Sequence, residues 1–111
     1  MPKILVADKM HDSIASMLNQ KGLECDYRPT IQRDEIIEIL SEYDGLIIRS
    51  KTPVDQSLID RGTNLRVVGR AGAGIDQIDV DYLASKNIAL FNAPEGNRDS
   101  LGEHAIGMLL S

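Results

Sequence analysis

Residues Val67 to Asp79 read VVGRAGAGIDQID. A short apolar run ends in a basic, glycine-rich segment, and a helix-like segment follows it. Glycine has no Cβ, so Gly69, Gly72 and Gly74 allow another group to come close to the backbone. Arg70 places a permanent positive charge among them. A buried strand that leads through such a loop into a helix is typical of an α/β fold.

Short apolar runs alternate with amphipathic segments on both sides of this stretch. Strands are expected at residues 4–7, 24–27, 46–48, 66–68 and 88–91, and helices at 11–21, 34–43, 52–62, 79–86 and 100–110. Five such alternations predict a parallel sheet with helices on both faces. The second strand is the least apolar and fits an edge. The expected fold is therefore an α/β, flavodoxin-like five-stranded sheet with the order 2-1-3-4-5.

Two of the expected helices have recognisable start signals. Thr52 fits an N-cap, Pro53 fits the first turn, and Asp55 stands where it can bond back to the cap. Ser100 and Glu103 have the spacing of a capping box at the start of the last helix.

The last helix is expected to leave the domain. Its final residues, AIGMLL at 105–110, are nearly all apolar and include no lysine or proline stop signal. Residues 1–98 are therefore interpreted as one domain, and residues 99–111 as the start of an interdomain helix that crosses into a missing domain. The alternative is that this helix covers the sheet of its own domain.

Bulk composition excludes several classes of protein. The 111 residues carry a net charge of −5, which argues against a nucleic-acid surface as the main function. The single Cys25 forms no internal disulfide and is interpreted as a small buried hydrophobe, so a reducing, cytoplasmic setting is expected. The apolar runs are shorter than a membrane span requires.

Ligands of an open parallel sheet bind beyond the carboxyl ends of its strands. Three arginines and two lysines are expected at this edge of an otherwise acidic chain: Arg28, Arg49, Arg70, Lys9 and Lys51. Arg49 and Arg70 follow neighbouring apolar strands, so the pair suits capture of a carboxylate or phosphate. Backbone N–H groups of the glycine segment can add donors. The alternative is that both arginines are ordinary surface charges.

The chemistry that the residues do not support is also informative. The glycine segment fails as a dinucleotide fingerprint, because Gln77 stands in place of a third glycine and the segment follows the fourth strand. Asp76 and Asp79 are too few for a metal site. His11 and His104 are interpreted as surface residues of helices. The residues alone therefore indicate an anion-binding domain without a reactive group, and a stand-alone regulatory module remains an alternative.

Three segments carry a resemblance to a known family: IIRSKTPV at 47–54, VVGRAGAGIDQIDVDYLASKNIALFNAPEGN at 67–97 and SLGEHAIGMLL at 100–110. They resemble the D-isomer-specific 2-hydroxyacid dehydrogenases. The resemblance implies an NAD-dependent oxidoreductase in which this region is the substrate-binding domain. In that family the nucleotide fingerprint and the catalytic Arg, Glu and His lie in a separate Rossmann domain, so no catalytic residue is expected in this chain.

The resemblance also implies residue roles. The implied substrate-binding residues are Arg49, Ser50, Arg70, Ala71, Gly72 and Asn97. Ala73 stands at a position that lies near the nicotinamide in the family and is the one implied cofactor contact. The substrate is expected to be a small anion, phosphoglycerate or another 2-hydroxy or 2-oxo acid. Arg70 favours a substrate with both a phosphate and a carboxylate, because two anionic groups need several cations. The resemblance further implies a homo-oligomer.

Overall fold

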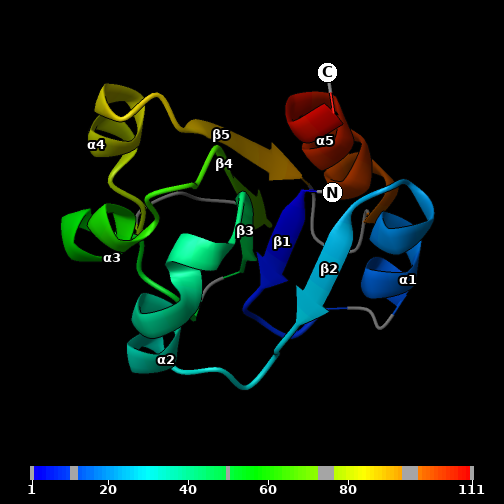
Figure 1. Cartoon of the computed structure of the whole chain (residues 1–111), viewed down its shortest axis with the longest axis horizontal. Helices are drawn as coiled ribbons and strands as arrows, with labels where there is room; N and C mark the ends of the chain where they lie inside the picture. Colours follow the sequence, from blue (N-terminus) through cyan, green and yellow to red (C-terminus); the bar gives the residue numbers. More distant parts are fainter. Residues whose placement is uncertain (1, 11–12, 50, 73–76, 94–97, 111) are drawn as a thin grey trace.

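A computed structural model describes residues 2–10, 13–49, 51–72, 77–93 and 98–110. Their strands form one parallel sheet in the order β2-β1-β3-β4-β5 (Figure 1), which confirms the predicted flavodoxin-like topology. The strands are β1 (Lys3–Val6), β2 (Glu24–Tyr27), β3 (Gly45–Ile48), β4 (Val67–Ala71) and β5 (Ala89–Ala93).

Helices cover both faces of the sheet, as predicted (Figure 1). The helices are α1 (Ser13–Gln20), α2 (Arg33–Ile39), α3 (Gln56–Arg61), α4 (Val80–Ser85) and α5 (Arg98–Leu110), with a short 3₁₀ turn, η1 (Leu40–Glu42), after α2. The apolar residues of α2, α3 and α4 share one core with one face of the sheet, while those of α1 and α5 share a second core with the other face. Because both faces are covered, the described residues of β3 and β4 are buried throughout.

The helix expected at residues 52–62 begins later than predicted. Asp55, not Thr52, is its N-cap, and the Asp55 side chain accepts a hydrogen bond from a backbone N–H of the first turn at 3.0 Å. The Thr52 hydroxyl instead donates to Asp8 at 3.2 Å. Val54 forms a parallel bridge with Ile78, so the backbone before α3 is already paired with another segment.

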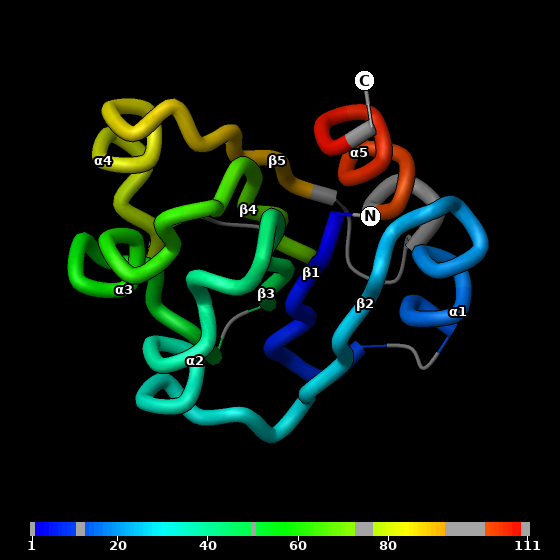
Figure 2. The backbone as a smooth tube through the Cα atoms, viewed as in Figure 1, coloured from blue at the N-terminus to red at the C-terminus, as the bar shows by residue number. Residues whose placement is uncertain are grey.

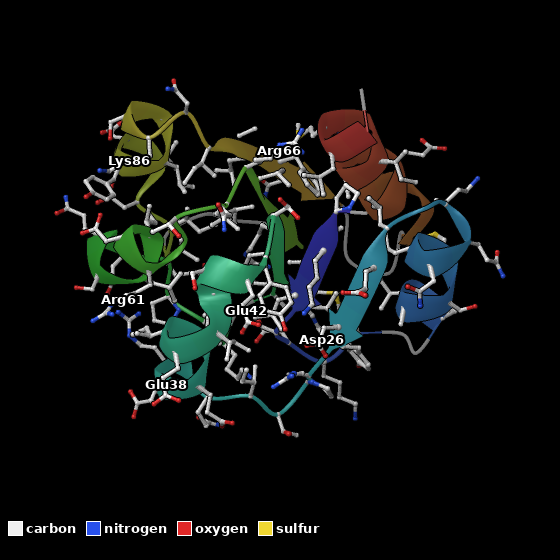
Figure 3. All side chains as sticks on the ribbon, in the orientation of Figure 1. Asp26, Glu38, Glu42, Arg61, Arg66 and Lys86 are labelled. Atoms are coloured by element: carbon white, nitrogen blue, oxygen red, sulfur yellow. The ribbon has the colours of Figure 1, made fainter. Side chains whose placement is uncertain are left out.

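The last helix begins at Arg98, so Ser100 lies inside its first turn and not at the N-cap position before it. In Figure 2, α5 lies beside α1 on one face of the sheet. Ala105 and Leu109 are buried there, and the Arg66 guanidinium donates to the backbone carbonyl of Leu109 at 3.4 Å (Figure 3). One face of the helix therefore packs on its own sheet, and its continuation into a second domain stays a prediction. The domain boundary after residue 98 stays a prediction.

Gly69 gives close packing between two strands. It pairs in register with Phe91, and a Cβ added to Gly69 would lie 2.4 Å from Cζ of the Phe91 ring. The same ring stacks on the imidazole of His104 with 5.1 Å between ring centroids. The group that comes close to Gly69 is therefore a side chain of the chain's own core, which links β4, β5 and α5.

Gly69→Ala is expected to lower the free energy of unfolding by about 1–3 kcal/mol, because the new methyl group overpacks this contact. Urea denaturation measures the change. Gly107→Ala is the matched control: nothing lies within 4 Å of a Cβ at this exposed helix position, so it should stabilise by about 0.5–1 kcal/mol. The cost of Gly69→Ala should fall in a Phe91→Leu background, and an equal cost in both backgrounds would show that the ring is not the obstacle.

Candidate anion-binding site

The ends of β3 and β4 lie side by side at the carboxyl edge of the sheet. Ile48, the last residue of β3, pairs with Arg70, and Arg49 follows directly. The fourth strand was predicted to end at Val68, but β4 continues through Ala71 because β3 and β5 pair with it on both sides. Arg70 and Ala71 are therefore part of the sheet, and the loop begins after them.

Arg70 is 7% exposed, so its charge is buried beside the end of the strand. Its Nη1 donates to the carbonyl oxygen of Ala71. Gly72 has a φ of +118°, a backbone conformation that favours glycine, and a Cβ there would lie 2.9 Å from Arg70 Nη1, so the guanidinium would have to shift. The Gly72 carbonyl accepts a hydrogen bond from the Asn92 amide at 3.4 Å. The buried guanidinium and the turn thus form one local structure.

Arg49 lies one strand away and is half-buried. Its Nη1 donates to the carbonyl oxygen of Lys9 at 2.9 Å, which brings the loop after β1 against the loop after β3. Arg49 and Arg70 are therefore on adjacent strands at the same edge, as predicted. The positive charge of Arg70 lies within the protein, whereas that of Arg49 lies nearer the surface.

Asp8 organises the loop that follows β3, a role that the sequence analysis did not assign. Its carboxylate is 3% exposed and accepts hydrogen bonds from the backbone N–H of Arg49 at 2.6 Å and of Lys51 at 3.3 Å. It also accepts from the Thr52 hydroxyl at 3.2 Å. One carboxylate thus holds residues on both sides of position 50. An aspartate directly after a buried strand was the signal that pointed to such a role.

Lys51, one of the cations expected at this edge, has a structural role. Its Nζ donates to the carbonyl oxygens of Ala7, Pro29 and Ile31 at 2.9, 3.2 and 2.8 Å, and lies 3.5 Å from Asp8 Oδ1. The ammonium group therefore ties together the loops that follow β1, β2 and β3. Its charge is largely committed to those oxygens.

Arg28 belongs to a separate polar cluster at the β2 edge. Its Nε donates to Asp26 at 2.9 Å, and the Tyr43 hydroxyl donates to the same carboxylate. Partial burial acts to raise the pKa of Asp26, but the Tyr43 and Arg28 bonds outweigh it and the pKa is lowered. Burial and the Asp26 charge raise the pKa of Tyr43. Of the three arginines expected at this edge, Arg49 and Arg70 therefore remain for an anion site, together with the exposed Lys9.

The other chemical groups of the described chain offer no reactive centre. Burial, followed by the Asp26 charge, raises the pKa of the half-buried Cys25 thiol to about 11, which leaves almost no thiolate at neutral pH. His104 is exposed but stacks on Phe91. No cluster of three or more His, Cys, Asp or Glu residues with metal-binding geometry occurs among the residues described. None of the helices described is long and apolar enough to cross a membrane.

Three of the predicted site residues, Ser50, Ala73 and Asn97, lie outside the described residues. The other four predicted substrate contacts can be placed: Arg49 follows β3, Arg70 and Ala71 end β4, and Gly72 follows with a positive φ. The structure therefore places these residues at one sheet edge and adds the Asp8 carboxylate that organises it, while their contacts to a substrate stay a prediction.

The fold is a flavodoxin-like α/β domain, with Arg49 and Arg70 at the carboxyl ends of adjacent strands. Residues 4–106 match the model of the D-isomer specific 2-hydroxyacid dehydrogenase family, catalytic domain. The chain belongs to that family, and the resemblance noted in the sequence is confirmed.

Within this family, the chain is similar to enzymes named D-3-phosphoglycerate dehydrogenase. The chain is 36% identical over 109 residues to the D-3-phosphoglycerate dehydrogenase of Archaeoglobus fulgidus, covering 98% of this chain and 21% of that protein. It is 36% identical over 111 residues to the D-3-phosphoglycerate dehydrogenase of Synechocystis, covering 100% and 20%. The chain thus spans about a fifth of the length of the curated relatives it matches.

A solved structure agrees with these relatives. The NAD⁺-bound 3-phosphoglycerate dehydrogenase of Entamoeba histolytica superimposes with a TM-score of 0.76 at 30% identity, covering 97% of this chain and 38% of that one. The Pyrococcus horikoshii PH0520 protein superimposes with a TM-score of 0.77 at 20% identity, covering 84% and 28%, which supports the fold alone.

The residues described do not fit a dinucleotide cradle. Such a cradle needs a glycine-rich turn between the first strand and its helix. Here β1 leads into Ala7, Asp8 and Lys9, and Asp8 is fully occupied with the loop after β3. Gln77 replaces a third glycine in the segment after β4. The family's NAD is therefore not held by these parts of the chain.

Proposed function

We propose that the protein carrying this chain is an NAD-dependent D-3-phosphoglycerate dehydrogenase, and that residues 1–98 form its substrate-binding domain. The reaction oxidises the C2 hydroxyl group to a ketone, with NAD as the hydride acceptor. In this reading the protein performs the first step of serine biosynthesis. Residues 99–111 begin the helix that leads to the NAD-binding domain.

The observation that carries the proposal is the pair of arginines at adjacent strand ends. In the register of the sheet Arg49 follows the residue that pairs with Arg70, in a chain whose relatives are D-3-phosphoglycerate dehydrogenases. Arg49 supplies donors at the surface, the Ala71–Gly72 backbone lies at the end of the neighbouring strand, and the buried Arg70 adds positive charge behind it. These groups bind and orient a small substrate with two anionic groups, a carboxylate and a phosphate. Ser50 and Asn97 are proposed as further substrate contacts, and Ala73 as a contact to the cofactor.

Two broader features belong to the same proposal. The intact protein is a homo-oligomer in the cytoplasm, as is expected for a soluble enzyme of this family. A stand-alone regulatory module is not favoured, because the family match extends over residues 4–106. If the intact protein bound D-3-phosphoglycerate without oxidising it, the regulatory-module alternative would be favoured instead.

The test is NADH formation by the intact protein with D-3-phosphoglycerate, D-glycerate and D-lactate. We expect kcat/KM for D-3-phosphoglycerate to exceed that for D-glycerate by at least about 100-fold, because the phosphate contacts are lost in D-glycerate. Residues 1–111 alone should form no NADH, since the part of the chain that the structure describes provides no dinucleotide cradle. A preference for D-glycerate or D-lactate would contradict the phosphoglycerate assignment. Turnover by residues 1–111 would contradict the proposal that NAD binds in a separate domain.

A further inference from the structure

The peptide groups of Arg49 are held at both ends by side chains from other segments. The N–H of Arg49 donates to Asp8 at 2.6 Å, from the end of β1. Its carbonyl oxygen accepts a hydrogen bond from Gln77 Nε2 at 2.6 Å, from the segment between β4 and α4. Both contacts are partly shielded from water, where hydrogen bonds are electrostatically stronger.

Gln77 is itself fixed by backbone pairing. Its carbonyl oxygen accepts from the N–H of Val54 at 2.8 Å, and the N–H of Asp79 donates to the carbonyl oxygen of Val54 at 2.9 Å. Val54 and Ile78 form the parallel bridge between these two segments. The Gln77 amide therefore extends from an anchored backbone, so its contact with Arg49 joins the loop after β3 to the segment that follows the Arg70 strand end.

We propose that Gln77 is a positioning residue for substrate binding, which acts by holding Arg49 in register with the end of β4. The proposal rests on the proposed function. Asp8 fixes the loop from the β1 side and Gln77 fixes it from the β4 side. Holding Arg49 before the substrate arrives lowers the ordering cost of binding, which is the usual benefit of a preorganised site.

The contact uses the N–H of the Gln77 amide and the full length of its side chain. Asparagine is one methylene shorter, and methionine has a similar length but no N–H. Gln77→Met therefore removes the hydrogen bond while keeping most of the side-chain volume. Gln20→Met is the matched control, because Gln20 is exposed at the end of α1, on the other face of the sheet.

The kinetic test uses the intact protein with D-3-phosphoglycerate and NAD. Gln77→Met should raise KM for D-3-phosphoglycerate by about 5- to 20-fold and leave kcat within about 2-fold, because a contact made equally in the ground and transition states is weakened. Gln20→Met should leave both values unchanged. An unchanged KM in Gln77→Met overturns the proposal.

A double-mutant cycle separates positioning from a general structural role. If Gln77 acts through Arg49, Gln77→Met should change KM by less than about 2-fold in an Arg49→Ala background. The same 5- to 20-fold rise in both backgrounds would show that Gln77 acts elsewhere, and it would overturn the proposal.

Amide hydrogen exchange supplies a readout that does not depend on turnover. The Arg49 N–H should exchange at least about 10-fold faster in Gln77→Met than in the wild type, because the loop opens more often. If the wild type does not oxidise D-3-phosphoglycerate, the proposed function fails. The hydrogen-exchange measurement alone then decides whether Gln77 positions Arg49. Faster exchange then retains Gln77 as the residue that positions Arg49, and unchanged exchange overturns that role as well.

Discussion

Replacing Asp8 with alanine is expected to lower the free energy of unfolding by about 2–4 kcal/mol. The change removes a carboxylate that is 3% exposed and accepts from two backbone N–H groups and the Thr52 hydroxyl. It also leaves the Lys51 ammonium without its carboxylate partner. Donors that lose a buried acceptor pay their desolvation cost without compensation. Urea denaturation followed by circular dichroism measures the loss.

Two further variants make this result interpretable. Asp8→Asn keeps the size and one acceptor oxygen but removes the charge, so it should cost about half as much as Asp8→Ala. Glu38→Ala deletes a carboxylate that points into solvent from α2 (Figure 3), and it should change the free energy of unfolding by less than about 0.5 kcal/mol. A loss below about 1 kcal/mol in Asp8→Ala, comparable to that in Glu38→Ala, would mean that Asp8 does not organise the edge.

The sequence predicted the sheet well because its signals are local and agree with one another. The strands that became β1, β3 and β4 are short apolar runs, which a sheet covered on both faces requires. The half-exposed pattern of β2 reflects its place at the edge, so its polar residues also predicted the strand order. Gly62 and Asp79 marked the end of α3 and the start of α4 correctly.

The errors occurred where a distant partner outweighs a local signal. Thr52 has the residue type of an N-cap, yet the buried Asp8 carboxylate, 44 positions away, takes its hydroxyl group. The end of β4 was placed too early because glycine and arginine suggest a loop, whereas pairing with both neighbouring strands keeps them in the sheet. Propensity is a weak signal against such tertiary contacts.

The sequence predicted where the candidate site lies in the sheet, but not the side-chain contacts that hold it. Topology alone puts Arg49 and Arg70 at one edge, because the carboxyl ends of parallel strands coincide. The structural use of Lys51 could not be read from the sequence, since it depends on three carbonyl oxygens from two other loops. The Gln77 contact with Arg49 likewise joins residues 28 positions apart.

The central claim is that the edge formed by the ends of β3 and β4 binds the substrate anion through Arg49. Arg49→Ala in the intact protein should weaken the binding free energy of D-3-phosphoglycerate by about 1.5–3 kcal/mol, the scale of a hydrogen bond to a charged group. This corresponds to a roughly 10- to 150-fold rise in Kd. Arg61→Ala is the matched control. Arg61 is exposed in the last turn of α3, so this substitution removes the same charge at a place away from this edge (Figure 3).

Isothermal titration calorimetry of D-3-phosphoglycerate into the wild type, Arg49→Ala and Arg61→Ala measures this difference most directly. The arrangement of Arg49, Arg70 and the Gly72 turn predicts a Kd at least about 10-fold higher in Arg49→Ala, with Arg61→Ala within about 2-fold of the wild type. Equal Kd values for the three proteins would contradict an anion site at this edge.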